Sequence, residues 1–197
     1  MVRRKFGRSV VKVALLVEGP SDVKTMPILV KRILGERVRI ISRNMRGRGG
    51  VLNRRKVEAV INEVLRRNPD LSKVIVCVDS ECTSLDETED RAQEVRKAVA
   101  SEVRCPVHYV VVGHALEGWL LADVEAVRKY LKGVVPITPS ATLDCKPKEV
   151  MRGLFRKAGR NFLSDRDGPK MAEMMDLDRA SKRNKSLATF REILKDP

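Results

Sequence analysis

The sequence is poor in aromatic residues, cysteine motifs and long apolar runs. Aromatic side chains make up 4% of the 197 residues, too few to build a stacking platform for nucleic-acid bases. The four cysteines show no C-x-x-C spacing, so we expect reduced, intracellular thiols and neither a zinc site nor a disulfide framework. No apolar run is long enough to cross a membrane. Residues 3–17 make a poor signal peptide, because Lys12 interrupts them and no cleavage site follows. We therefore expect a cytoplasmic protein without a membrane partner.

Positive charge is abundant and unevenly distributed. The chain has 40 Lys and Arg against 26 Asp and Glu, for a net charge of +14, while 43% of its residues are hydrophobic. That hydrophobic content excludes a disordered chain. Residues 69–145 carry a net charge of −5, whereas residues 1–68 and 146–197 carry +13 and +6. An acidic middle between basic ends suits a metal site that acts on a nucleic acid, and a generic charged surface explains it about as well.

Strand and helix patterns alternate along the first two thirds of the chain. Valine-rich apolar runs predict four buried strands, at Val10–Val17, Val38–Ile41, Val74–Val78 and Val107–Val112. A helical pattern follows each of them, and the last is expected to form one helix over residues 116–131. The alternation predicts an α/β, Rossmann-like fold with about four strands in a mainly parallel sheet, helices on both faces and a ligand site at the carboxyl ends of the strands.

The pattern changes near residue 132. A proline-containing linker and short basic helices follow, the latter around residues 148–158, 169–175 and 186–194. We therefore expect an α/β domain over residues 1–132 and a C-terminal helical appendage, residues 133–197, packed on it.

Acidic residues follow two of the predicted strands. Glu18 comes directly after the first strand, and Asp79 and Glu81 come after the third. Because the carboxyl ends of parallel strands lie together, these side chains are expected to share one edge of the sheet, where hard oxygen ligands suit Mg²⁺ or Mn²⁺. A single acid at a strand end is usually a turn or cap residue, but three in matching positions favour a metal site.

Three more acids are candidates near this edge. Glu117 lies close to the end of the fourth strand and is our choice as a further metal ligand. Asp22 is either a first-turn acid favoured by the helix dipole or an auxiliary acid of the site, with the structural role slightly favoured. Asp123 is six residues beyond Glu117 on the expected helix, so at most one of the two is expected to face the metal.

Known phosphate motifs are absent, since there is no G-x-G-x-x-G turn after the first strand and no G-K-[ST]. The best phosphate-binding candidates are Arg43, Arg46 and Arg48, which alternate with glycines in a predicted loop over residues 42–50. Lys24 is a further candidate, although a mobile, solvated loop is the alternative for the arginines. A wider basic footprint is expected from Arg3, Arg4, Lys5, Arg8, Lys182, Arg183 and Lys185.

Three ring side chains have both a structural and a functional interpretation. Trp119 lies beside two leucines and is expected in the core, with base stacking as the alternative. His108 is expected to pack within the fourth strand. His114 follows that strand and is expected to be a turn residue, with a place in the site as the alternative.

Two segments carry a family resemblance. Glu18-Gly19-Pro20-Ser21-Asp22 after a buried strand, with Asp79-Ser80-Glu81 after a later one, resembles the Toprim fold of topoisomerases, DnaG-type primases, and OLD and RecR proteins. The segment Leu116–Asp123 (LEGWLLAD) and the tail over residues 170–194 are similar to an uncharacterised Toprim-like, OLD-nuclease-related family. The resemblance implies that Glu18 acts as general acid or base and that Asp79 and Glu81 bind Mg²⁺, although Glu81 replaces the usual Asp.

The residues and the resemblance together predict a Mg²⁺-dependent enzyme that cleaves phosphodiester bonds, a nuclease acting on DNA or RNA. One alternative is a non-catalytic module that binds nucleic acid or docks a partner. Another is a small-molecule phosphatase, because Asp79 to Thr83 weakly resembles the D-x-D-x-T motif of haloacid-dehalogenase phosphatases. By analogy with OLD-like systems a separate ATPase is an expected partner, and the oligomeric state is left open.

Overall fold

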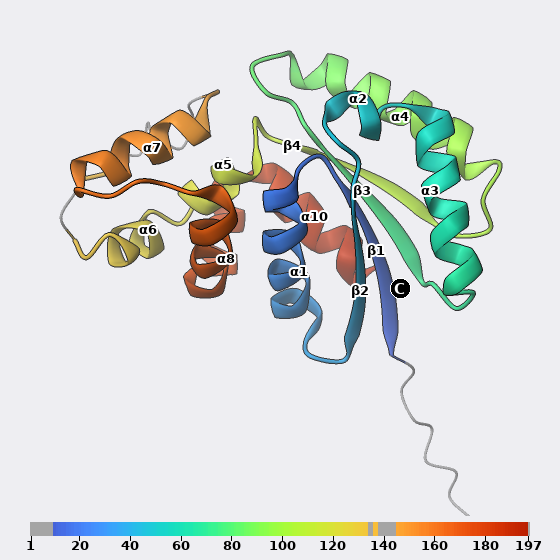
Figure 1. Cartoon of the computed structure of the whole chain (residues 1–197), viewed down its shortest axis with the longest axis horizontal. Coiled ribbons are helices and arrows are strands. Elements are labelled where there is room, and N and C mark those ends of the chain that lie inside the picture. The colour runs from blue at the N-terminus through green and yellow to red at the C-terminus, as the bar shows by residue number, and fades with distance from the viewer. Residues whose placement is uncertain (1–9, 134–135, 138–144, 197) are drawn as a thin grey trace, which may run out of the picture.

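The computed structural model describes residues 10–133, 136–137 and 145–196. The predicted basic residues Arg3, Arg4, Lys5 and Arg8 lie outside this part of the chain. Four strands form one all-parallel sheet in the order β2-β1-β3-β4 (Figure 1). They are β1 (Val11–Val17), β2 (Val38–Asn44), β3 (Lys73–Asp79) and β4 (Val107–Val112). The expected α/β, Rossmann-like class is confirmed.

Helices cover both faces of the sheet (Figure 1). In chain order they are α1 (Pro20–Leu34), α2 (Arg48–Val51), α3 (Arg54–Arg67), α4 (Leu85–Ala100), α5 (Leu116–Leu121), α6 (Val124–Tyr130), α7 (Pro147–Lys157), α8 (Ser164–Met174), α9 (Leu177–Arg183) and α10 (Lys185–Lys195). Within the described residues, none of them combines the length and the apolar character needed to cross a membrane.

Alternate residues of each strand enter two separate cores. In β1, Val13 and Leu15 face a core shared with α1 and α10, whereas Ala14 and Leu16 face a core shared with α3 and α4, and all four are fully buried. A strand buried on both faces has to be apolar at every position. This requirement explains the continuous valine-rich runs in the sequence.

The predicted loop over residues 42–50 is partly regular structure. Strand β2 continues to Asn44, because Leu16 and Val17 of β1 pair with Arg43 and Asn44. Four residues later the chain forms the short helix α2. Pairing with the whole of β1 therefore extends β2 beyond its apolar residues.

The single helix predicted over residues 116–131 is wrong, because the chain forms two helices there. Helix α5 ends at Leu121, and Asp123 is the N-cap of α6, where its side chain accepts a hydrogen bond from the Ala126 N–H. Helix α9 was not predicted. Both departures occur where an aspartate caps a short helix, since Asp176 plays the same role for α9.

The helices after residue 132 share a core with the sheet. Helix α8 packs against α1, and α10 packs against both β4 and α1. Trp119 is fully buried with its ring centroid 5.1 Å from that of Phe190 in α10, and its Nε1 donates to Ser186 Oγ at 2.8 Å. The core interpretation of Trp119 is confirmed, and α10 is attached to the sheet through it.

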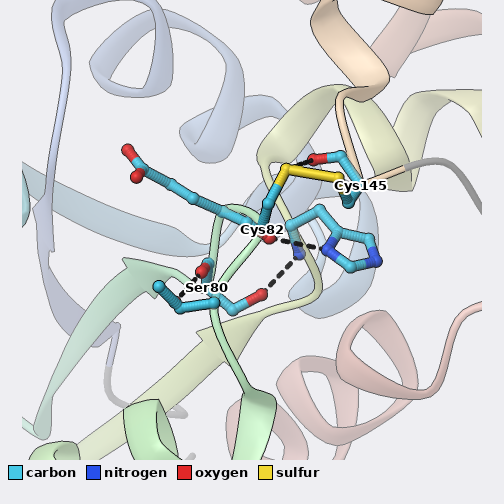
Figure 2. Close-up of a disulfide and its surroundings, with 6 residues drawn as sticks. Ser80, Cys82 and Cys145 are labelled. Atoms are coloured by element: carbon cyan, nitrogen blue, oxygen red, sulfur yellow. Dashed lines mark hydrogen bonds between the residues drawn. A yellow bond between two sulfur atoms is a disulfide. The ribbon is translucent and has the colours of Figure 1, made fainter.

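The prediction of reduced thiols is wrong for one pair of cysteines. Cys82 and Cys145 form a disulfide with Cα atoms 5.1 Å apart (Figure 2). Cys77 and Cys105 are buried free thiols. The bonded pair is 63 residues apart in sequence, so only the fold, which brings the loop after β3 to the start of α7, reveals the partnership.

Candidate active site

Glu18 and Asp79 meet at the carboxyl edge of the sheet. Glu18 follows β1 and Asp79 ends β3, and these strands are neighbours. The Asp79 N–H donates to Glu18 Oε1 at 2.8 Å. Strand β1 connects through α1, on one face of the sheet, to β2 on one side of it. Strand β3 connects through α4, on the other face, to β4 on the opposite side. The two connections therefore diverge between β1 and β3 and divide the sheet there. Such a division is where open α/β sheets bind their ligands.

A cavity of about 640 Å³ lies over this edge, and acidic residues from several elements line it. These acids are Glu18, Asp22, Asp79, Glu81, Glu117 and, in α8, Asp165. The structure therefore gathers all the predicted acids except Asp123 around one space. Its lining also includes segments of α7 and of the chain leading into α8.

Two of these acids are fixed by local backbone and side-chain contacts. Asp22, in the first turn of α1, accepts a hydrogen bond on Oδ2 from the Gly19 N–H at 2.9 Å. It therefore caps its own helix, as in the favoured structural role, and it also lines the cavity, while its role as an auxiliary acid stays a prediction. Glu117, buried on α5, accepts a hydrogen bond on Oε1 from Ser164 Oγ of α8 at 2.8 Å.

Glu81 occupies an unusual backbone conformation. Its φ is 51°, in the left-handed region that costs a non-glycine residue about 1–2 kcal/mol. His114, itself at φ 65°, holds it there: the Glu81 N–H donates to the His114 carbonyl at 2.8 Å, and His114 Nδ1 lies 2.7 Å from the Glu81 carbonyl oxygen. The His114 N–H donates to Ser80 Oγ at 2.8 Å (Figure 2). His114 is thus a turn residue, as predicted, and it also supports the site loop.

The pKa values of the half-buried acids are raised. Burial raises the pKa of Glu18 to about 7, against the opposing hydrogen bond from the Asp79 N–H and with help from Asp22 and Glu81. Burial, followed by the charges of Asp22 and Glu18, raises the pKa of Asp79 well above its usual range. The pKa of Asp22 is also raised by burial, despite the Gly19 N–H. Burial is thus the largest cause for all three acids, and the neighbouring carboxylates add to it.

The donor chemistry of the cluster fits a hard divalent cation. Among the described residues, no three His, Cys, Asp or Glu side chains stand in an arrangement ready to hold a metal ion. Within that part of the chain, however, Asp79 and Glu81 have no hydrogen bonds to their carboxylate oxygens, and Glu18 and Glu117 each use one oxygen only. Carboxylate oxygens are the ligands that Mg²⁺ and Mn²⁺ prefer. Asp79, Glu81 and Glu117 could hold such an ion after side-chain adjustment.

Basic side chains also line the cavity, and we call them its basic wall. Lys148 and Arg152 of α7 and Lys24 of α1 line it. Lys24 is 3.1 Å from Asp165, and Arg152 contacts Glu149 on its own helix at 2.5 Å. Lys148 and Arg152 were not singled out in the sequence, although their spacing of four places them on one helix face. The cavity therefore has an acidic floor and a basic wall.

The three loop arginines lie outside this cavity. Arg43 donates to the Ser42 carbonyl at 3.1 Å, and Arg46 is exposed. Arg48 donates to Thr83 Oγ1 at 2.9 Å and to Thr88 Oγ1 at 2.8 Å, so it ties its loop to the start of α4. The positive charge of Arg48 lowers the pKa of Glu18, but burial and the neighbouring carboxylates raise that pKa by more.

The backbone of that loop does reach the site. The Gly47 N–H donates to the Glu18 carbonyl at 2.8 Å, and Gly47 lines the cavity at φ 93°. Only glycine adopts this conformation without strain. In this segment, the backbone at Gly47 therefore contributes more to the geometry of the cavity than the arginine side chains do.

Asp123 and the predicted basic residues near 183 lie elsewhere. Asp123 is fully buried and accepts hydrogen bonds from Arg179 Nε at 2.7 Å and the Asp176 N–H at 2.6 Å, which anchor α9. Arg183 and Lys185 line a separate cavity of about 480 Å³ beside β4 and α4. His108, within β4, is partly exposed rather than fully packed.

Comparison with known proteins places the chain in one family. Residues 17–195 match the family model described as "Domain of unknown function (DUF4276)", so the protein belongs to the DUF4276 family. No curated protein and no solved structure matches the chain. The resemblance to Toprim proteins stays a prediction.

Proposed function

We propose that this DUF4276 protein is a divalent-metal-dependent phosphodiesterase, a nuclease acting on DNA or RNA. The observation that carries the proposal is the convergence of carboxylates from β1, β3 and α5 on one cavity whose other wall is cationic. Buried acids without counter-charge attract a hard divalent cation, and a cationic wall attracts the phosphates of a polyanion. The Toprim resemblance implies the same roles for the acids.

In this proposal Asp79, Glu81 and Glu117 hold Mg²⁺ or Mn²⁺, with Asp22 as an auxiliary acid. The bound cation supplies neutralisation of the phosphate charge and lowers the pKa of water that attacks phosphorus. His114 and Ser80 keep the Glu81 loop in place through the hydrogen bonds to its backbone.

Glu18 is the proposed general acid or base. Its Oε1 is fixed by the Asp79 N–H, which leaves the other oxygen to take or give a proton at the reacting phosphate. Lys148 and Arg152, on one face of α7, bind the non-bridging phosphate oxygens, and Lys24 extends this wall.

The net charge of +14 supports a nucleic acid as substrate. A cytoplasmic location, expected from the lack of a signal peptide, and a separate ATPase partner, taken from the analogy with OLD-like systems, belong to the proposal, and the oligomeric state stays open. The cavity volume of about 640 Å³ is also within the range of small-ligand sites. For this reason a small-molecule phosphatase is the second candidate.

The test measures Mn²⁺ binding by calorimetry and cleavage of fluorescent DNA, RNA and a chromogenic phosphate ester. We expect Glu18→Gln to lower the cleavage rate by about 10²–10⁴-fold, and Asp79→Asn to abolish Mn²⁺ binding. Glu87→Gln and Asp90→Asn, both on the exposed surface of α4, are the matched controls and leave both properties unchanged.

Three outcomes would replace the proposal. Salt-sensitive nucleic-acid binding with no cleavage under any metal would make the protein a binding module. Hydrolysis of the phosphate ester alone would make it a phosphatase. Cleavage that persists in EDTA and in Glu18→Gln would exclude the metal-dependent mechanism.

A further inference from the structure

The Cys82–Cys145 disulfide links two segments that each contribute a residue to the lining of the cavity. Cys82 directly follows Glu81, which belongs to the acidic floor, and Cys145 lies two residues before the first residue of α7. Three residues beyond Cys145 is Lys148, on the basic wall. The disulfide therefore joins the loop after β3, which carries Glu81, to the segment that leads into α7 (Figure 2). The two cysteines are 63 residues apart in sequence.

The two ends of α7 are held differently. Its later part is anchored by Met151 and Phe155, which are fully buried in the core. Its first turn contacts α5, where Pro147 packs close to Gly118. Among the described residues, the loop after β3 is joined to the start of α7 by the disulfide and by the contact of Cys82 Sγ with the Cys145 carbonyl at 3.2 Å. Cutting the disulfide thus removes the covalent link between the loop after β3 and the start of α7, while Pro147 stays buried against α5.

The bonded pair is accessible, and the other two cysteines are not. Cys82 is exposed and Cys145 is half-buried, whereas Cys77 and Cys105 are buried. Lys146 and Lys148 flank Cys145, and positive charge near a disulfide favours the approach of an attacking thiolate. The geometry therefore selects one pair for exchange with an outside thiol.

We propose that Cys82–Cys145 is a thiol–disulfide exchange site that sets the width of the cavity. The oxidised form holds the start of α7 against the loop that carries Glu81, and the reduced form releases it. Its consequence for substrate binding rests on the proposed function, whereas the exchange and the release of α7 do not.

The reaction requires a dithiol reductant, either a small molecule or a protein. One of its thiolates attacks a sulfur of the bond, forms a mixed disulfide and expels the other cysteine as a thiolate, which takes up a proton. The second thiolate of the reductant then attacks the reductant's own sulfur in the mixed disulfide and expels the second cysteine as a thiolate, which also takes up a proton, so that the reductant leaves with an internal disulfide. Two electrons and two protons pass from the reductant to the chain. Cytosolic disulfides in mesophiles are usually transient and redox-sensing, so this chemistry is compatible with the proposed cytoplasmic location.

The first measurement counts thiols and follows amide exchange in the full chain before and after dithiothreitol. We expect iodoacetamide to label Cys82 and Cys145 only after reduction. Hydrogen exchange in peptides covering residues 80–84 and 146–152 is expected to accelerate by about fivefold or more, while α3 is unchanged. Labelling of both residues without reduction, or unchanged exchange of these peptides after reduction, overturns the proposal.

The second measurement uses inorganic phosphate as a probe of the basic wall. We expect calorimetry to show an affinity about tenfold lower after reduction. The Cys82→Ser, Cys145→Ser double variant should behave as the reduced protein with or without dithiothreitol, whereas Cys105→Ser keeps the response. If phosphate binds equally in both forms, the cavity is not controlled by the bond. If it binds in neither form while hydrogen exchange still responds, the proposed function fails and the exchange site stands.

Discussion

Carboxylates at the edge of the sheet and carboxylates that contact the C-terminal helices lie in opposite electrostatic surroundings. Glu18 and Asp79 are half-buried among other carboxylates, and burial raises the pKa of both. Asp123 and Asp167 are more deeply buried, with no exposed surface. Burial is the largest single contribution and acts to raise the pKa of each, but the hydrogen bonds and charges around them, led by Arg179 at Asp123 and by Arg166 at Asp167, together outweigh it and lower both pKa values.

This difference distinguishes acids that are proposed to act in function from acids that stabilise the fold. Asp167 accepts hydrogen bonds from Arg166, Tyr130 Oη and the Leu163 N–H, so its charge is fully compensated. Among the described residues, Asp79 and Glu81 have no hydrogen bonds to their carboxylate oxygens, and Glu18 and Glu117 each use one oxygen only. Asp123 and Asp167 are thus paired with cations of the chain itself, whereas under the proposed function the cluster at the sheet edge takes a cation from outside.

The largest expected effect on stability comes from breaking a compensated acid. Asp123→Asn removes a buried charge from its bonds to Arg179 and the Asp176 N–H. We expect the free energy of unfolding to fall by about 2–4 kcal/mol, measured by urea denaturation. Asp90→Asn, at an exposed position, should change it by no more than about 0.5 kcal/mol. Equal effects of the two substitutions would contradict the structural role of Asp123.

A divalent cation should stabilise the protein through the acids at the sheet edge and not through Asp123 or Asp167, because, in the described part of the chain, only the first group lacks a cation of its own. At about 100 times its Kd, Mn²⁺ is expected to raise the free energy of unfolding by about 2.7 kcal/mol. EDTA should reverse the gain, and Asp79→Asn should abolish it, while Asp123→Asn keeps it. Thermal denaturation with and without metal makes this measurement. A gain that survives in Asp79→Asn would place the metal elsewhere.

Without metal, neutralising the cluster should stabilise the fold. Asp79→Asn removes a charge that its surroundings disfavour, so we expect a rise in the free energy of unfolding of about 0.5 kcal/mol or more in EDTA. The same type of substitution is thus expected to have opposite signs at Asp79 and at Asp123. A loss of stability at both positions would show that Asp79 is compensated as well.

The pH dependence of stability also distinguishes the two groups of acids, because they titrate in different pH ranges. The pKa of Glu18 is raised from 4.5 to about 7, so its contribution to stability is complete below pH 4.5 and is lost as the pH rises to about 7. The lowered pKa values of Asp123 and Asp167 give a contribution that is present above pH 3.8 and lost as the pH falls below it. Denaturation in EDTA at several pH values should show Glu18→Gln losing the decline between pH 4.5 and 7, whereas Glu87→Gln retains it. An unchanged decline in Glu18→Gln would assign it to another group.

Much of the fold and part of the site follow from local sequence. The four valine-rich runs predict the strands because burial on both faces requires apolar residues at every position, and the predicted strand Val107–Val112 has the same bounds as β4. The placement of Glu18 and Asp79 directly after two such runs was enough to predict one shared edge. The two-helix break at Asp123 was not predicted, since a capping aspartate and a ligand aspartate look alike in sequence.

The sequence by itself determined which strands are buried and which acids stand at their ends, because these properties depend on neighbours in the chain. Only the tertiary structure decided which acids receive an arginine, that Lys148 and Arg152 rather than Arg43, Arg46 or Arg48 line the cavity, and that Cys82 meets Cys145. Each of these outcomes is a contact between segments far apart in sequence. Contacts of this kind are set by how helices pack on a sheet, which no local pattern of residues encodes.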